Sequence, residues 1–129
     1  MILALVDDLL FSSKIRAVAG HASRPVIFVR SAEALATHAR SGPPDLILVD
    51  LDRAALDPIG AIRALKADPD LRTIRVVGFV SHVHADRIAE ARSAGIDQVL
   101  ARSAFVQALP NLVAAEANPV PGRRPAGDA

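Results

Sequence analysis

The chain has 129 residues, 51% of them hydrophobic, which is enough for one domain with a sizeable buried core. Its 15 basic and 14 acidic residues leave a formal net charge of +1, so no overall field attracts nucleic acid or a membrane surface. The lack of cysteine excludes disulfides and thiolate metal sites, and the early apolar run MILALV is too short to span a bilayer. We therefore expect a soluble, cytoplasmic protein without nucleic acid or membrane partners.

Five short apolar runs alternate along the chain with segments of helical periodicity. The runs are ILALV, PVIFV, DLILV, IRVVGFV and QVLA, at residues 2–6, 25–29, 45–49, 74–80 and 98–101. Each is followed by apolar residues that recur every three or four positions, as Ile59, Ile62 and Leu65 do. Strand and helix therefore alternate five times, which predicts an α/β fold: a five-stranded parallel sheet in a doubly wound three-layer sandwich. Such sheets carry their sites at the carboxyl ends of the strands.

Local signals place the ends of three helices. Ser31 is a favourable N-cap for the second helix, and Asp57-Pro58 is a cap followed by proline at the first helical position. Gly95 stands where a left-handed C-terminal cap would end the fourth helix. These signals agree with the limits set by the apolar periodicity.

The C-terminal part of the chain gives weaker signals. Leu109 precedes Pro110 and is therefore biased away from the helical region, so RSAFVQA predicts a turn and the last helix is expected to begin at Pro110. Residues 118–129 are rich in proline and glycine without periodicity, which predicts a disordered tail. We expect one domain over residues 1–117 followed by this tail.

Charged and polar residues follow the predicted strands at the edge where a site is expected. Asp7 and Asp8 come after the first strand, Asp50 after the third, Ser81 after the fourth and Arg102 after the fifth. Carboxylates that converge without a counter-charge raise one another's pKa, and a hard divalent cation removes that cost. Mg²⁺ suits two or three carboxylates with water in its remaining positions. The sequence therefore predicts an acidic pocket with Mg²⁺ as cofactor.

These residues resemble the receiver domain of bacterial two-component response regulators, a flavodoxin-like fold. The resemblance covers about residues 1–115, and it is carried by LVDD (5–8), PDLILVDLDRAALDP (44–58), FVS (79–81) and AGIDQVLARSAF (94–105). It implies a phosphorelay protein of chemotaxis-regulator type that takes a phosphoryl group from a histidine kinase or phosphotransfer protein and signals by contact with a downstream partner. It also implies that the protein catalyses at most its own phosphoryl transfer and is otherwise not an enzyme.

The resemblance also assigns roles to single residues. Asp50 is the implied phosphoacceptor, and the implied Mg²⁺ ligands are Asp7, Asp8, Asp50 and the backbone carbonyl of Asp52. Ser81 and Arg102 are the implied contacts to the phosphoryl group, with Ser81 acting in the switch. The stretch 84–117 is the surface that the family commonly uses for partners, which implies a homodimer through it.

At several positions the chain departs from the family pattern. Arg102 replaces the family's lysine and Ser103 the proline that follows it, while Val99 stands at the position of an aromatic switch residue. Pro58 occupies a usual glycine position, and His82 follows Ser81 where the family prefers a small residue, so we expect its ring to cover the pocket. Arginine is longer and planar, so it can hold a phosphate bidentately or pair with a carboxylate in place of a metal.

Simpler interpretations remain open for the same residues. Asp7 and Asp8 can cap the first helix, since carboxylates favour a helix N-terminus. The segment SHVHAD suggests either a metal site or, more simply, solvated loop histidines. As functions, a phosphoacceptor receiver competes with a pseudo-receiver that docks or dimerises without phosphorylation, and with a small α/β enzyme or ligand-binding domain.

Overall fold

The computed structural model of the protein describes residues 1–81 and 84–114. The predicted strands and helices are all present there, and their ends are close to those expected except at the start of the last helix. The strands are β1 (Ile2–Leu5), β2 (Val26–Val29), β3 (Leu46–Asp50), β4 (Arg75–Val80) and β5 (Gln98–Ala101). The helices are α1 (Leu9–His21), α2 (Ala32–Ser41), the short 3₁₀ helix η1 (Ala54–Leu56), α3 (Pro58–Ala67), α4 (Ala85–Ala94) and α5 (Arg102–Ala114).

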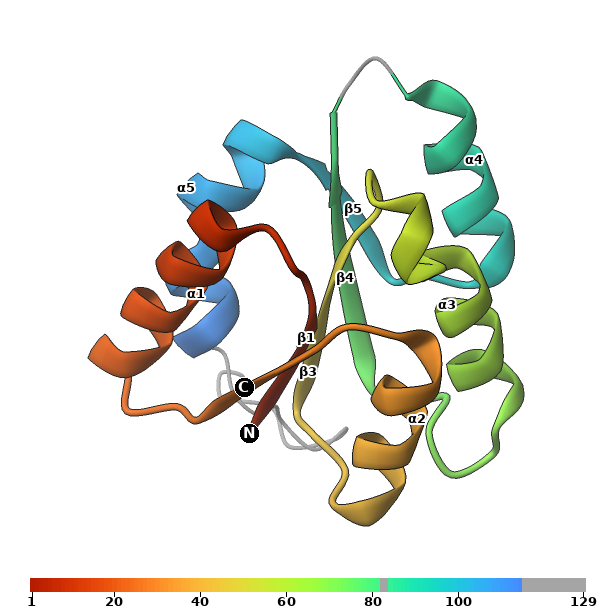
Figure 1. Ribbon diagram of the computed structural model, residues 1–129, viewed down its shortest axis with the longest axis horizontal. Coiled ribbons are helices and arrows are strands. Elements are labelled where there is room, and N and C mark those ends of the chain that lie inside the picture. Colours follow the sequence, from red (N-terminus) through yellow and green to blue (C-terminus); the bar gives the residue numbers. More distant parts are fainter. Residues whose placement is uncertain (82–83, 115–129) are drawn as a thin grey trace, which may run out of the picture.

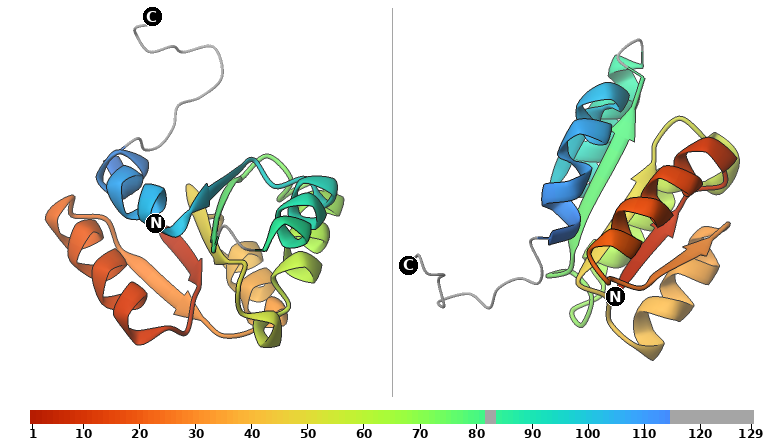
Figure 2. Two further views of the ribbon diagram at one scale, coloured as in Figure 1. Left: turned by 90° about the horizontal axis from the view of Figure 1, so that it is seen from above. Right: turned by 90° about the vertical axis from the view of Figure 1, so that its left-hand side faces the viewer.

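The strands form one parallel sheet in the order β2-β1-β3-β4-β5. Helices α1 and α5 cover one face of the sheet, and α2, α3 and α4 cover the other, as Figures 1 and 2 show. This is the predicted doubly wound α/β sandwich. The strand order reverses direction at β1 and β3, and parallel sheets place their sites at such a reversal. Asp7, Asp8 and Asp50 were predicted to lie at the carboxyl ends of these two strands.

The core consists of two clusters, one on each face of the sheet, because successive strand residues point to opposite sides. In β1, Leu3 and Leu5 pack toward α2, α3 and α4, whereas Ile2 and Ala4 pack toward α1 and α5. Every residue of β1 and β3 is buried. The central strands are therefore covered on both faces, which explains their continuous apolar sequence.

Three predicted helix caps are confirmed. The Ser31 side chain accepts a hydrogen bond from the Ala34 N–H at 3.0 Å, and the Asp57 carboxylate accepts one from the Gly60 N–H at 3.2 Å. Asp57 itself adopts φ 52°, in the left-handed region. Gly95 ends α4 with φ 102°, where a side chain would be strained.

The predicted start of the last helix is wrong. Helix α5 begins at Arg102, so RSAFVQA is helical and Pro110 lies inside the helix. The buried residues of α5 lie on one face of the helix and are Phe105, Leu109, Leu112 and Val113. Burying this face outweighs the local preference of the residue before proline. No helix in the described part of the chain is long and apolar enough to cross a membrane, and the predicted tail 118–129 lies outside it.

Candidate functional site

The predicted site residues lie at one edge of the sheet. Asp50 is the last residue of β3, and Asp7 and Asp8 occupy the turn from β1 to α1. Ser81 directly follows β4, and Arg102 is the first residue of α5, immediately after β5. Segments far apart in the chain thus bring three carboxylates, a serine and a cation to the carboxyl ends of four strands, as the parallel topology requires.

Asp50 is fully buried, with no exposed side-chain surface. Its Oδ1 accepts a hydrogen bond from the Asp52 N–H at 2.9 Å, but its Oδ2 has no hydrogen-bond partner among residues 1–81 and 84–114. The pKa of Asp50 is raised, mainly by burial and further by the neighbouring charges of Asp52 and Asp8. The hydrogen bond from the Asp52 N–H and the charge of Arg102 lower it, but by less. An unpaired buried oxygen is costly, so this carboxylate is not explained by its contribution to stability.

Arg102 bridges two carboxylates at the end of the sheet. Its Nε donates a hydrogen bond to Asp52 Oδ2 at 2.9 Å, whereas its Nη2 lies 3.5 Å from Asp50 Oδ2. The guanidinium carbon also lies 4.5 Å from the centre of the Phe11 ring and 5.3 Å from that of Phe79, a cation–π arrangement that limits where the group can move. The hydrogen-bonded partner of Arg102 is therefore Asp52, which the sequence had singled out only for its backbone carbonyl.

The Asp52 side chain joins three parts of the site. Besides Arg102, it accepts the Ser81 N–H at 2.9 and 3.1 Å on its two oxygens and the His84 Nδ1–H at 2.7 Å. Burial alone would raise the pKa of Asp52, but these hydrogen bonds from His84, Arg102 and Ser81 together lower it. Asp52 is therefore held as an anion that links the ends of β3 and β4 to the starts of α4 and α5.

The two acids after β1 have separate partners. Asp7 forms a two-point contact with Arg53, whose Nε and Nη2 donate to its two oxygens at 2.9 and 2.8 Å. These hydrogen bonds lower the pKa of Asp7. Asp8 caps α1 by accepting the Phe11 N–H at 3.0 Å, so the simpler interpretation of Asp8 as a helix cap holds for its Oδ1.

The donor set fits a divalent cation in part. Asp50 offers an oxygen that accepts no hydrogen bond from the described residues, Asp8 has a carboxylate close enough for its charge to raise the pKa of Asp50, and Asp52 adds a backbone carbonyl. Two carboxylates and a carbonyl, completed by water, are a suitable set for Mg²⁺. Within residues 1–81 and 84–114, however, no three acidic or histidine side chains converge closely enough to hold an ion. The third predicted carboxylate, Asp7, is held by Arg53 instead.

Several participants were not expected from the sequence. The simpler interpretation of the SHVHAD histidines as solvated loop residues does not describe His84, whose ring forms a hydrogen bond with Asp52. Because the Asp52 carboxylate can only accept, the proton lies on His84 Nδ1. Arg53 and Phe11 were not predicted to belong to the site, although their places next to Asp52 and in the first turn of α1 bring both to this edge. The predicted pocket cover His82 lies outside the described residues.

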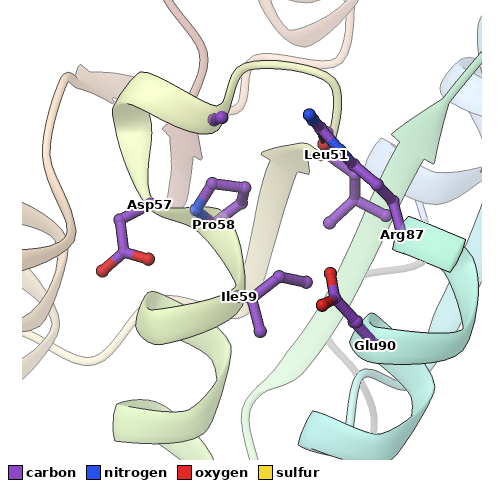
Figure 3. Close-up of a pocket in the computed structure, with 7 residues that line it drawn as sticks. Leu51, Asp57, Pro58, Ile59, Arg87 and Glu90 are labelled. Carbon is purple, nitrogen blue, oxygen red and sulfur yellow. Dashed lines mark hydrogen bonds between the residues drawn. The ribbon is translucent and has the colours of Figure 1, made fainter. Parts of the chain in front are cut away.

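A hollow of about 200 Å³ lies beside this site, between the start of α3 and helix α4. Figure 3 shows Pro58 and Ile59 of α3 on one side and Arg87 and Glu90 of α4 on the other, with Leu51 next to Arg87. Arg87 Nη1 donates to the Leu51 carbonyl at 2.8 Å. Helix α4 is thus tied to the two residues after Asp50, by Arg87 to Leu51 and by His84 to Asp52.

No protein-family profile matches the chain, and no curated protein matches it. Solved structures do match. The phosphorylated cyanobacterial phytochrome response regulator RcpA is 23% identical with a TM-score of 0.74, over 88% of each chain. The chemotaxis response regulator CheY4 of Vibrio cholerae is 12% identical with a TM-score of 0.74, over 87% of this chain and 93% of that one.

A third match is the receiver domain of a sensor histidine kinase from Pseudomonas aeruginosa PAO1, whose structure has a magnesium ion coordinated in the active site cleft. It is 20% identical with a TM-score of 0.72, over 87% of this chain and 95% of that one. Likeness at these identities establishes the fold. The chain has the fold of response regulator receiver domains, as the strand-end residues predicted.

Proposed function

We propose that the chain is a receiver domain of a phosphorelay, and that it accepts a phosphoryl group on Asp50. The main support is Asp50 Oδ2, a fully buried oxygen that has no hydrogen-bond partner in the described part of the chain and lies 3.5 Å from a guanidinium nitrogen. Such an oxygen costs stability, and a nucleophilic role that needs a free lone pair accounts for it. The donor would be a histidine kinase or phosphotransfer protein, and the output would be contact with a downstream protein.

The residues around Asp50 suit phosphoryl transfer, which depends on positioning and charge neutralisation more than on covalent help. An Asp50 oxygen attacks the phosphorus, the bond from phosphorus to the donor atom breaks, and the donor keeps the electron pair. Arg102 is placed to stabilise the negative charge on the transferred oxygens through its Nη groups. Ser81, at the end of β4, would hold the product's phosphoryl group through its hydroxyl.

Asp8, Asp50 and the Asp52 carbonyl would hold Mg²⁺, whose charge would offset that of the carboxylates and the phosphoryl group. Asp7 would join them once released from Arg53. The magnesium ion in the active site cleft of the Pseudomonas aeruginosa receiver domain supports the same role for this edge of the sheet.

Intact-protein mass spectrometry after incubation with acetyl phosphate and Mg²⁺ tests this function. We expect wild type to gain one phosphoryl group. The Asp50→Asn variant keeps the size and the buried position of the side chain and should gain none. A gain of equal size in Asp50→Asn would place the acceptor elsewhere and refute the proposal.

A phosphorylation-independent pseudo-receiver is the second candidate, and one observation favours it. Arg102 already lies between Asp50 and Asp52, so the site has a counter-charge without any metal. In that case the domain would act as a docking or dimerisation module, for which residues 84–117 are the expected surface. Wild type that gains no phosphoryl group from acetyl phosphate, phosphoramidate or a phosphorylated histidine kinase would favour this candidate. Gel filtration would then show whether the chain dimerises.

A further inference from the structure

The Asp52 carboxylate is fixed from three sides. It accepts hydrogen bonds from the Ser81 N–H, from His84 and from Arg102, and its side chain is 12% exposed. Because Ser81 and His84 belong to the connection between β4 and α4, the carboxylate cannot follow Arg102 if the arginine moves away. Asp52 is therefore a fixed anchor, and Arg102 is the side chain that it holds.

Arg102 lies on the solvent side of Asp50. Its side chain is 32% exposed, whereas that of Asp50 is 0% exposed, and the two groups are 3.5 Å apart. The Nε–Asp52 hydrogen bond and the faces of Phe11 and Phe79 keep the guanidinium in this position. The Asp50 oxygen that would attack a phosphoryl donor is therefore covered by the Arg102 guanidinium, which is hydrogen-bonded to Asp52 and not to Asp50.

We propose that Asp52 acts as a brake: its carboxylate holds Arg102 across Asp50 and keeps Asp50 closed to phosphoryl donors. This inference rests on the proposed phosphoacceptor function and adds a regulatory contact to it. A phosphoryl group is a stronger bidentate acceptor for arginine than a carboxylate that is already shared with two other donors. A docked donor therefore opens the site by competing with Asp52 for Arg102. Asp52 is a positioning residue in this scheme, since it acts through Arg102.

The Asp52→Asn variant tests the brake. Its amide oxygen can still accept the Ser81 N–H, but the negative charge that holds Arg102 is lost. Asp70→Asn is the matched control, because it removes one exposed carboxylate from the connection between α3 and β4, at the opposite ends of the strands. Circular dichroism establishes that both variants are folded.

Two readouts are compared, and only one depends on phosphorylation. The first is carboxyl labelling with a water-soluble carbodiimide and glycine ethyl ester, quantified at Asp50 by peptide mapping. The second is the rate of phosphorylation by acetyl phosphate with Mg²⁺. We expect Asp52→Asn to raise both by about tenfold, the scale set by loss of one charge-assisted hydrogen bond. Asp70→Asn should leave both at the wild-type value.

The outcomes separate the brake from the function on which it rests. Equal Asp50 labelling in wild type and in folded Asp52→Asn would refute the brake, even if both proteins are phosphorylated. Faster labelling with no phosphoryl adduct in either protein would refute the phosphoacceptor function and leave only the covering contact. If Asp52→Asn does not fold, Arg102→Gln replaces it for the labelling readout. Arg102→Gln should also expose Asp50, and unchanged labelling would again refute the brake.

Discussion

Replacing the buried carboxylate at the end of β3 should stabilise the protein. In Asp50→Asn the Oδ1 acceptor for the Asp52 N–H is kept, while the charge that burial and the neighbouring acids disfavour is removed. The neutral amide group that replaces Oδ2 is also buried, so the gain comes from the removed charge alone. Burial of a charge without a hydrogen-bond partner costs about 1–3 kcal/mol more than burial of a neutral group, and the attraction to the partly exposed Arg102 offsets up to about 1 kcal/mol of this. We therefore expect the free energy of unfolding to rise by about 1–2 kcal/mol at pH 7. For a domain of this size that raises Tm by roughly 5 °C.

The difference in the free energy of unfolding between wild type and Asp50→Asn should also depend on pH, which gives a second check. The pKa of Asp50 is raised from its ordinary value of 3.8, so its ionisation costs more in the folded chain than in the unfolded chain. As the pH rises from about 3.8 through the raised pKa, wild type therefore becomes less stable relative to Asp50→Asn. Below 3.8 Asp50 is protonated in both states, and the electrostatic advantage of Asp50→Asn should vanish. Acids with lowered pKa values, such as Asp7 and Asp52, are present in both proteins and cancel.

Urea denaturation followed by far-ultraviolet circular dichroism measures these differences, since the chain has no tryptophan or tyrosine for fluorescence. Asp45→Asn is the control of opposite sign. Hydrogen bonds to the amino terminus and to Arg24 hold the pKa of Asp45 below its ordinary value, so that variant should be less stable than wild type at pH 7. If Asp50→Asn is no more stable than wild type at pH 7, the reasoning about the buried charge is wrong.

Substitutions at three further positions test other parts of the account. Arg53→Gln releases Asp7 and removes a positive charge from the edge, so calorimetry should show several-fold tighter Mg²⁺ binding; weaker binding would count against Asp7 as a ligand. Asp57→Ala loses the α3 cap and places alanine at φ 52°, which should cost about 2 kcal/mol by urea denaturation, whereas Asp57→Gly should cost less. Gly78→Ala would place a Cβ 2.8 Å from Ile96 Cδ1 and should destabilise by about 1–3 kcal/mol; unchanged stability would show that this packing relaxes freely.

The fold could be predicted because its determinants are local and periodic. Each strand of the sheet is an apolar run, and each cap signal, such as Asp57-Pro58, acts within one turn of its helix. The start of α5 could not be found in this way. The bias of Leu109 before proline is a local signal, but the burial of Phe105 and Leu109 against the sheet is a tertiary effect that no window of sequence contains.

The positions of the site residues could be predicted, but their partners could not. Parallel topology alone brings Asp50 and Arg102 to one edge of the sheet. Which carboxylate Arg102 contacts depends on side-chain directions set by the Phe11 and Phe79 rings and on the turn that carries Asp52. The same holds for Arg53, whose pairing with Asp7 depends on the shape of the loop after β3.

Localisation of the phosphoryl group tests the central claim most directly. Wild type is incubated with acetyl phosphate and Mg²⁺, the acyl phosphate is reduced with borohydride, and the peptides are sequenced by mass spectrometry. An aspartyl phosphate is converted to homoserine, so the account predicts homoserine at position 50 and unmodified aspartate at the neighbouring Asp52. Homoserine at any other position, or at none with a competent phosphodonor, would contradict it.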